Sequence, residues 1–228
     1  MIIKNSQQDV NIEEPIHVKK VSLKISGGAD SAIVGYMLSK YVAEERPDIK
    51  IFPLTTNHPK KPYQGVYASR VINFYKEIFG EHIFGKHYIN TTRRMDTNED
   101  YANAQTTNQE KAYKTEKIQR NYSGITSNPP LDIIDTFRKP NGKLIKGPVD
   151  DRNGKDFPVY KNYSWKHLAN IDKKGVAELY ETLGVMETLF PLTRSCEAYA
   201  HESHYNIDKH CEKCWFCMER FWGFSHYE

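Results

Sequence analysis

The sequence contains no long apolar run and no marked excess of charge of one sign. No run approaches the roughly 18 apolar residues that a membrane span needs, and the N-terminal segment lacks the basic start and apolar centre of a signal peptide. The 32 Lys and Arg residues nearly balance the 29 Asp and Glu residues, which argues against wholesale binding of nucleic acid. We therefore expect a cytoplasmic protein with neither a membrane nor a nucleic-acid partner.

Cysteine is absent from the first 195 residues. Three of the four cysteines form the pattern C-x-x-C-x-x-C at Cys211, Cys214 and Cys217, and Cys196 lies fifteen positions before the first of them. In a reducing compartment this clustering indicates a metal rather than disulfides, and four thiolates can complete a tetrahedral Zn²⁺ site. Two alternatives remain, namely an iron-sulfur cluster, which uses the same spacing, and a group of free buried thiols. Of the three, we expect zinc.

The sequence also lacks the two commonest phosphate-binding loops, G-x-x-x-x-G-K-[ST] and G-x-G-x-x-G. A different glycine turn lies between an alternating apolar segment at 21–25 and a helical apolar stripe at 33–42. The turn consists of Ser26, Gly27, Gly28, Ala29, Asp30 and Ser31. Its glycines let a ligand come close to the backbone, and the first N–H groups of a helix starting near Asp30 or Ser31 attract an anion. The pattern predicts a phosphate-binding loop, and the alternative is an ordinary glycine turn.

The remaining apolar patterns predict one α/β domain over residues 1–228. They indicate a β-α-β-α-β order, with later elements after it, which is typical of a parallel sheet covered by helices. The expected elements after the first strand and helix are a strand at 49–55, a helix at 66–78, a strand at 82–89, a strand at 122–127, a long loop at 137–162 and a helix at 175–183. Three polar segments lie outside this pattern: an N-terminal arm at 1–17, a helical insertion near the active-site mouth at 93–121, and the cysteine-bearing C-terminal segment at 187–228.

Two segments resemble known families. Residues 26–31 resemble the S-G-G-x-D-S loop of the PP-loop ATP pyrophosphatases, or adenine nucleotide alpha-hydrolases. The C-terminal segment resembles the zinc motif of the 7-cyano-7-deazaguanine synthases, which are PP-loop enzymes too, through Leu192-Thr193-Arg194-Ser195-Cys196, His210 to Cys214, Cys217, Arg220 and Gly223-Phe224. The resemblance implies a doubly wound, Rossmann-like parallel sheet, ATP at the carboxyl ends of its strands, a C-terminal Zn²⁺ site and a homodimer.

The same resemblance implies the chemistry of an ATP-dependent carbon-nitrogen ligase in queuosine biosynthesis. ATP would adenylate the carboxylate of 7-carboxy-7-deazaguanine and release pyrophosphate, ammonia would displace AMP to give an amide, and a second activation would give the nitrile. That family usually carries a Tyr-Pro-Asp-Cys-Arg stretch after the fourth strand, whereas this chain has Asn128-Pro129-Pro130-Leu131-Asp132. A related heteroaromatic carboxylate is therefore the other acceptor that we consider.

Individual roles follow from the loop and from the implied fold. The six residues from Ser26 to Ser31 would hold the pyrophosphate of ATP, and Asp30 and Ser31 would act in catalysis, with Asp30 also able to orient a loop N–H or a water on Mg²⁺. Thr55 and Thr56 are expected near adenine, and Gly124 beside the nucleotide. Asp132 and Asp135 would either hold Mg²⁺ or be solvated charges on a turn. Trp215, Phe216 or Phe224 would stack on the acceptor, or pack over the zinc site.

Two other function classes use parts of the same pattern. A PP-loop tRNA-modifying enzyme that transfers sulfur needs a free nucleophilic cysteine, and none remains if zinc takes all four. A zinc-containing nucleotide-binding module without catalysis would touch nucleic acid through the C-terminal segment, but residues 197–228 mix acidic and basic side chains and form no basic stripe. The ligase interpretation leaves neither the loop nor the cysteines unexplained.

Overall fold

A five-stranded parallel sheet with the order β5-β4-β3-β6-β7 forms the centre of the protein. The structure is a computed structural model that describes residues 1–59, 61, 63–91, 98–138, 141–145, 164–165, 168–198 and 206–227. The strands are β3 (Lys20–Lys24), β4 (Lys50–Asn57), β5 (Tyr88–Thr91), β6 (Arg120–Tyr122) and β7 (Ser164–Trp165). The first strand of the sheet along the chain, β3, lies in the middle, the next two run to one edge, and β6 and β7 lie on the other side of β3. The sheet is therefore doubly wound, as the sequence predicts.

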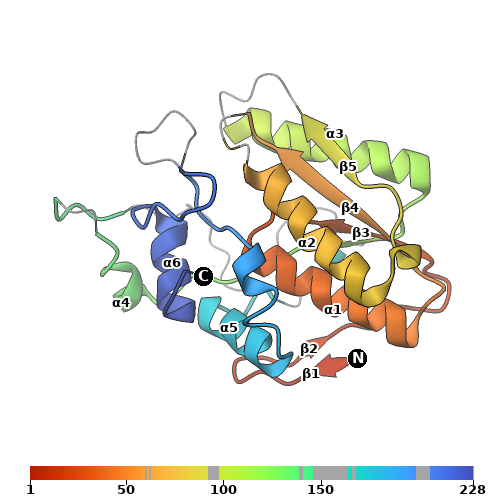
Figure 1. Ribbon diagram of the computed structural model, residues 1–228, viewed down its shortest axis with the longest axis horizontal. Coiled ribbons are helices and arrows are strands. Elements are labelled where there is room, and N and C mark those ends of the chain that lie inside the picture. Colours follow the sequence, from red (N-terminus) through yellow and green to blue (C-terminus); the bar gives the residue numbers. More distant parts are fainter. Residues whose placement is uncertain are drawn as a thin grey trace.

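Helices cover both faces of this sheet. The helices α1 (Ala29–Glu45) and α2 (Tyr63–Phe79) lie on one face, and α3 (Asn98–Glu116) lies against the other (Figure 1). The side chains of β4 alternate between the two faces of the sheet. Ile51 belongs to the large core on the α1 side, whereas Phe52 and Leu54 pack with Ala112 of α3. The predicted strand at 82–89 begins later, because a 3-10 turn, η1 (Glu81–Ile83), precedes β5.

The segment at 93–121, expected to be a polar insertion, contains the crossover helix of the sheet. Helix α3 connects β5 to β6 and packs on β4 and β5. Its composition conceals this role, because small side chains such as Ala104 and Ala112 provide the buried contacts. Asn108, which is also buried, donates hydrogen bonds to the carbonyls of Thr55 and Tyr88, both at 3.1 Å.

The N-terminal residues, expected to be an arm, form a small antiparallel pair of strands. β1 (Ile2–Ile3) pairs with β2 (Val10–Asn11), and the side chains of Ile3, Val10 and Ile12 are buried in the main core. The pair lies beside α5 (Lys173–Thr182) (Figure 1), where the Asn5 side chain donates to the Gly175 carbonyl at 2.8 Å. Each strand has two residues, so the sequence offers too few positions for an alternating pattern.

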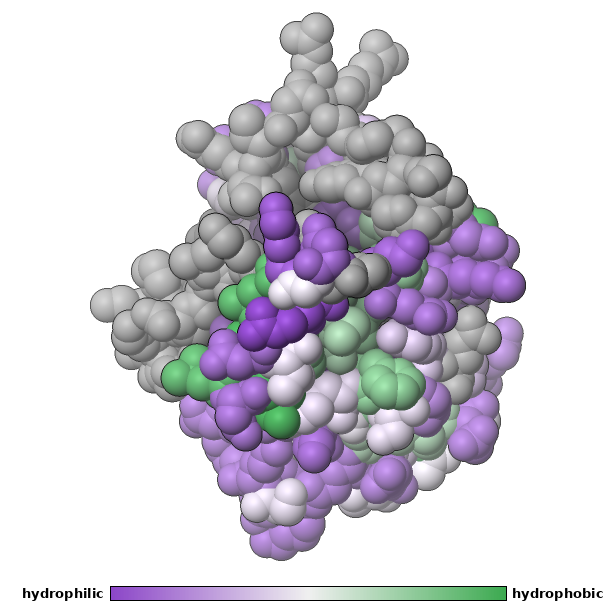
Figure 2. All heavy atoms as spheres, turned by 90° about the vertical axis from the view of Figure 1, so that its left-hand side faces the viewer, coloured by the Kyte–Doolittle hydropathy of each residue, from purple (hydrophilic) through white to green (hydrophobic). Residues whose placement is uncertain are grey.

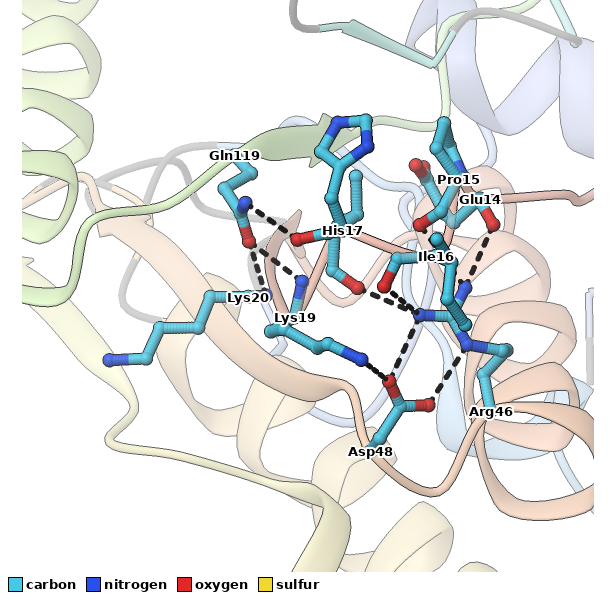
Figure 3. A network of polar contacts seen from close by, with 10 residues as sticks. Glu14, Pro15, Ile16, His17, Lys19, Lys20, Arg46, Asp48 and Gln119 are labelled. Carbon is cyan, nitrogen blue, oxygen red and sulfur yellow. Dashed lines mark hydrogen bonds and ion pairs between the residues drawn. The ribbon is translucent and has the colours of Figure 1, made fainter.

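Arg46, at the end of α1, fastens the connection between this hairpin and β3 (Figure 3). Its guanidinium donates to the carbonyls of Glu14 and Val18 at 2.8 and 2.9 Å and forms a forked ion pair with Asp48. The buried Glu14 carboxylate in turn accepts from the Tyr122 hydroxyl at 2.7 Å, which ties the same segment to β6. These contacts fix the position at which β3 enters the sheet.

The C-terminal helices pack beside α1. α5 contacts α1 and α6 (Trp215–Phe224), and it begins where the Asp172 side chain accepts hydrogen bonds from the N–H groups of Lys174 and Gly175. Two shorter elements complete the described chain, α4 (Leu131–Ile134) and the 3-10 turn η2 (Phe190–Leu192). Most of the predicted loop at 137–162 lies outside the described residues. Across the described ranges, none of the helices combines the length and apolar character of a membrane span.

Candidate functional site

The glycine turn connects β3 to α1 as the sequence predicts. Gly27 has a φ of +81°, and a Cβ atom there would lie 2.5 Å from the Cβ of Tyr67, so only glycine fits. Gly28 is the N-cap of α1 and no side chain caps the helix. The first helical hydrogen bond runs from the Ala32 N–H to the Gly28 carbonyl at 3.0 Å, so the three preceding N–H groups lie before the helical ladder. These groups are available to an anion.

Two serine hydroxyls, one buried and one exposed, hold the conformation of the loop. Ser31 is buried, its hydroxyl donates to the Gly28 carbonyl at 3.1 Å, and it accepts from the Ser26 N–H at 3.3 Å. Ser26 is exposed, and its hydroxyl lies 3.3 Å from that of Ser31. Ala29 differs from both, because its side chain is fully buried and its carbonyl accepts from the Tyr180 hydroxyl at 2.9 Å. Ala29 can therefore serve a ligand through its backbone N–H alone.

A cavity of about 250 Å³ opens above this loop at the carboxyl ends of the strands. That edge is where parallel α/β sheets bind ligands. The loop, the helices α2, α3, α5 and α6 and the C-terminal segment all contribute to its wall, which consists of Ser26, Gly28, Asp30, Ser31, Tyr63, Gln64, Gln105, Gly124, Lys173, Arg194, Ser195, Cys196, Glu197 and Phe216. Five of the residues predicted to contact the nucleotide, Ser26, Gly28, Asp30, Ser31 and Gly124, line it.

Gly124, just after β6, presses its backbone against the first turn of α1. A Cβ atom at this position would lie 2.5 Å from the Asp30 carbonyl carbon and from the Ser31 nitrogen. Real Cβ atoms do not approach backbone that closely, so a side chain here would displace the start of the helix. Gly124 thus supports the end of the cavity that the glycine loop forms, at the place where the sequence predicts a nucleotide contact.

Lys173 is a site residue that the sequence analysis missed. Its ammonium lies 2.6 and 2.5 Å from the two carboxylate oxygens of Asp30 and 3.4 Å from Glu219 of α6. Burial lowers the pKa of Lys173, but the carboxylates of Asp30 and Glu219 outweigh it, so the pKa is raised and the lysine is charged. The sequence separation of 143 residues between Lys173 and Asp30 leaves no local signal for this pair.

Gly27 and Ala29 of the loop do not line the cavity, and neither do the predicted adenine and Mg²⁺ contacts outside the loop. Thr55 is fully buried, where its hydroxyl donates to the Ile25 carbonyl and contacts His87 Nε2, both at 2.8 Å, and Thr56 is half-buried. Asp132 and Asp135, in and just after α4, are exposed. The adenine contact and the Mg²⁺ contact assigned to these residues stay predictions.

The four cysteines gather into one group. Their sulfur atoms all lie within 4.8 Å of one another, and the sulfurs of Cys211 and Cys217 are 3.8 Å apart. Ligands at about 2.3 Å from one tetrahedral ion lie about 3.8 Å from each other, so the spacing fits a single metal ion. An iron-sulfur cluster stands between its ligands and needs the thiolates farther apart. The arrangement is a candidate site for one ion.

The electrostatics of the group also favour a cation. Contacts with Cys211, Cys214 and Cys217 lower the pKa of the Cys196 thiol well below its usual range, whereas contacts with Cys196 and its neighbours raise the pKa of Cys217. Four thiolates this close repel one another, so they do not all ionise without a positive charge among them. A divalent ion would supply that charge and hold all four in the thiolate form.

The C-terminal segment 193–196 joins the cysteine group to the glycine loop. The Arg194 N–H donates to the Gly27 carbonyl at 2.8 Å, and Cys196 lies in the cavity wall. Arg220 of α6, which is fully buried, donates to the hydroxyls of Thr193 and Ser195 at 2.9 and 3.3 Å. One short segment therefore forms a wall of both the cavity and the candidate metal site.

Similarity to known proteins is confined to solved structures, because the sequence matches no family model and no curated protein. The U34-tRNA thiolase NcsA from Methanococcus maripaludis, solved with its 4Fe-4S cluster, is similar at 17% identity and a TM-score of 0.48, over 73% of this chain and 58% of the thiolase chain. This chain thus matches less than two thirds of the thiolase. NAD+ synthetase from Burkholderia pseudomallei is similar at 14% identity and a TM-score of 0.39, over 89% of this chain and 74% of the synthetase.

Proposed function

We propose that the protein is an ATP-dependent enzyme of the PP-loop type that transfers the adenylyl group of ATP to a carboxylate. A carboxylate oxygen would attack the α-phosphorus, and the bond to the bridging oxygen would break to release pyrophosphate. The observation that carries this proposal is the Ser26–Ser31 loop, whose helix N-terminus opens into a 250 Å³ cavity. The N–H groups of Ala29, Asp30 and Ser31 would hold the pyrophosphate, and Mg²⁺ would neutralise part of its charge.

For the acceptor, we propose 7-carboxy-7-deazaguanine or a related heteroaromatic acid. Ammonia would then displace AMP to give the amide, and a second activation would give the nitrile. Of the three aromatic residues considered for stacking, Phe216 lines the cavity, whereas Trp215 and Phe224 are each 5% exposed and pack in hydrophobic clusters. Phe216 is therefore the residue that we assign to stacking.

The metal that suits the cysteine group is Zn²⁺, because four thiolates in a tetrahedron around one ion are its typical structural site. Cys196, Cys211, Cys214 and Cys217 would hold it. When bound, the ion would supply the positive charge that keeps the four thiolates together, and the segment that carries Cys196 would be fixed against the loop. A sulfur-transferring tRNA enzyme is less well supported, since no cysteine lies outside this group.

The homodimer that the resemblance implies requires a contact surface on the protein. On the face that carries α4 and α6, hydrophobic residues are interspersed with hydrophilic ones in the part that is not grey (Figure 2). The homodimer therefore stays a prediction, to be tested by light scattering of the purified protein.

The reaction can be tested directly with purified protein, ATP, Mg²⁺, ammonium and 7-carboxy-7-deazaguanine. We expect AMP and pyrophosphate, together with the amide and the nitrile by mass spectrometry. ATP binding without either product would remove the deazaguanine assignment and leave the nucleotide site. A protein that binds no ATP would remove the whole proposal.

A further inference from the structure

The buried ion pair between Lys173 and Asp30 has no part in the reaction proposed above. We propose that Lys173 is a positioning residue of the nucleotide site, which holds the Asp30 carboxylate in place and is itself held by Glu219 of α6. This inference rests on the proposed binding of ATP phosphates at the Ser26–Ser31 loop.

The hydrogen bonds of Lys173 support an indirect role. A lysine ammonium has three N–H donors and no acceptor. Three carboxylate oxygens surround it, the two of Asp30 at 2.6 and 2.5 Å and one of Glu219 at 3.4 Å. The side chain is 3% exposed, so water does not replace these partners. Lys173 has no further donor for a ligand, and it therefore acts on the nucleotide through Asp30.

The position of Asp30 explains why such a residue is needed. Asp30 lies in the first turn of α1 and lines the cavity, next to the N–H groups that would hold pyrophosphate. An unpaired carboxylate at this place would repel the phosphate oxygens, and it would be free to turn into the cavity. The ammonium cancels that charge and fixes the orientation of the carboxylate, while leaving the backbone N–H of Asp30 to the ligand.

Helix α6 determines where the ammonium stands. Glu219 and Gly223 are four residues apart on α6, so they lie on the same side of the helix. Glu219 contacts the ammonium, and a Cβ atom at Gly223 would lie 2.4 Å from the Cγ atom of Lys173. Because α6 also carries Cys217, Lys173 is a second connection between the cysteine group and the nucleotide loop, beside segment 193–196.

A double-mutant cycle on the full chain tests the inference, with ATP affinity measured by calorimetry. We expect Lys173→Met to weaken ATP binding on the order of 30-fold or more in the parent, because it leaves a charged Asp30 without its partner. In the Asp30→Asn background the same substitution should change the affinity by less than about twofold, since no charge remains to be positioned. Lys174→Met, which alters the exposed neighbour on α5, is the control and should bind ATP as the parent does.

The alternatives give different results. Equal losses from Lys173→Met in both backgrounds would mean that Lys173 contacts ATP or only supports the fold, and would overturn the inference. If Lys173→Met does not fold, as judged by thermal unfolding, Glu219→Gln repeats the test with the ammonium in place. It should weaken binding several-fold in the parent and not in Asp30→Asn, and equal effects would again overturn the inference. A parent protein that binds no ATP would overturn the proposed function itself.

Discussion

Substituting alanine at each of the two loop glycines should separate binding from stability. Gly28 has a φ of −80° and a ψ of 157°, which any residue adopts. A Cβ atom there would lie 3.4 Å from Ser26 Oγ and 3.7 Å from the Arg194 carbonyl oxygen, which are ordinary contacts. Alanine is the poorer N-cap, which lowers the free energy of unfolding by up to about 1 kcal/mol. It also restricts the unfolded chain, which raises the free energy of unfolding by about 0.4–1 kcal/mol. We expect Gly28→Ala to leave the free energy of unfolding nearly unchanged.

Gly27→Ala provides the matched control. The φ of +81° costs an alanine about 1–2 kcal/mol. The new Cβ atom would also lie 2.5 Å from the Cβ of Tyr67 and 2.7 Å from the backbone nitrogen of Ala68, and overpacking of this kind costs about 1–3 kcal/mol. Together these terms predict that Gly27→Ala lowers the free energy of unfolding by about 2–5 kcal/mol.

Among folded molecules, the loss of ATP affinity should be larger for Gly28→Ala, the variant that is destabilised less. The methyl group of Gly28→Ala would stand in the cavity wall, where phosphate oxygens must approach the helix N–H groups. We expect ATP affinity to fall by roughly 10- to 100-fold, which corresponds to about 1.4–2.8 kcal/mol. Urea unfolding measures the stability of both variants, and calorimetry measures the binding of ATP. Parent-like affinity in Gly28→Ala, or destabilisation equal to that of Gly27→Ala, would refute this account of the loop.

Three further predictions concern the metal, the pH dependence and the N-terminal segment. Elemental analysis should find one zinc ion per chain, and Cys214→Ser should lose it and speed hydrogen exchange across α6, because structural zinc contributes on the order of 10 kcal/mol. Burial lowers the pKa of His87 from 6.5 to about 4, so the unfolded chain binds its proton first. The free energy of unfolding should therefore reach its full value above about pH 6.5 and decline as the pH falls towards 4. In urea titrations, His87→Gln should remove about 1–2 kcal/mol of that decline, which allows for the partial exposure of the His87 side chain. Arg46→Lys, which cannot form the forked contact with Asp48, should lower the free energy of unfolding by about 1–3 kcal/mol, whereas Lys40→Met at an exposed helix pair should change it by less than about 0.5 kcal/mol.

Features encoded by short spacings could be predicted from the sequence. The turn from Ser26 to Ser31 is defined by adjacent residues, and the strand and helix beside it show their periods within a few positions. The triplet Cys211, Cys214 and Cys217 is equally local, and the fourth ligand was the one cysteine left. In each case the chemistry depends on neighbours in the chain, so the pattern and the structure contain the same information.

Features that depend on distant contacts could not be predicted. Lys173 looks like any helix lysine until Asp30 and Glu219 are placed around it. Helix α3 has too few apolar residues to reveal a buried side, because its contacts are made by small and amide side chains such as Ala112 and Asn108. In both cases the fold overrides the ordinary expectation for the residue type, namely that lysine and asparagine face solvent.

Buried contacts of Arg220 also connect the two recognisable motifs, which are far apart in the sequence. Arg220 is fully buried on α6, so its charge and its five N–H groups must find partners inside the protein. It finds them in the hydroxyls of Thr193 and Ser195 and in the carbonyls of Phe190 and Tyr227, and its guanidinium lies 3.7 Å from the centre of the Phe190 ring. These contacts hold the segment that places Cys196 in the cysteine group and the Arg194 N–H against the loop. The segment is therefore fixed from both sides, since a movement of either end would break hydrogen bonds to Arg220 or to the Gly27 carbonyl.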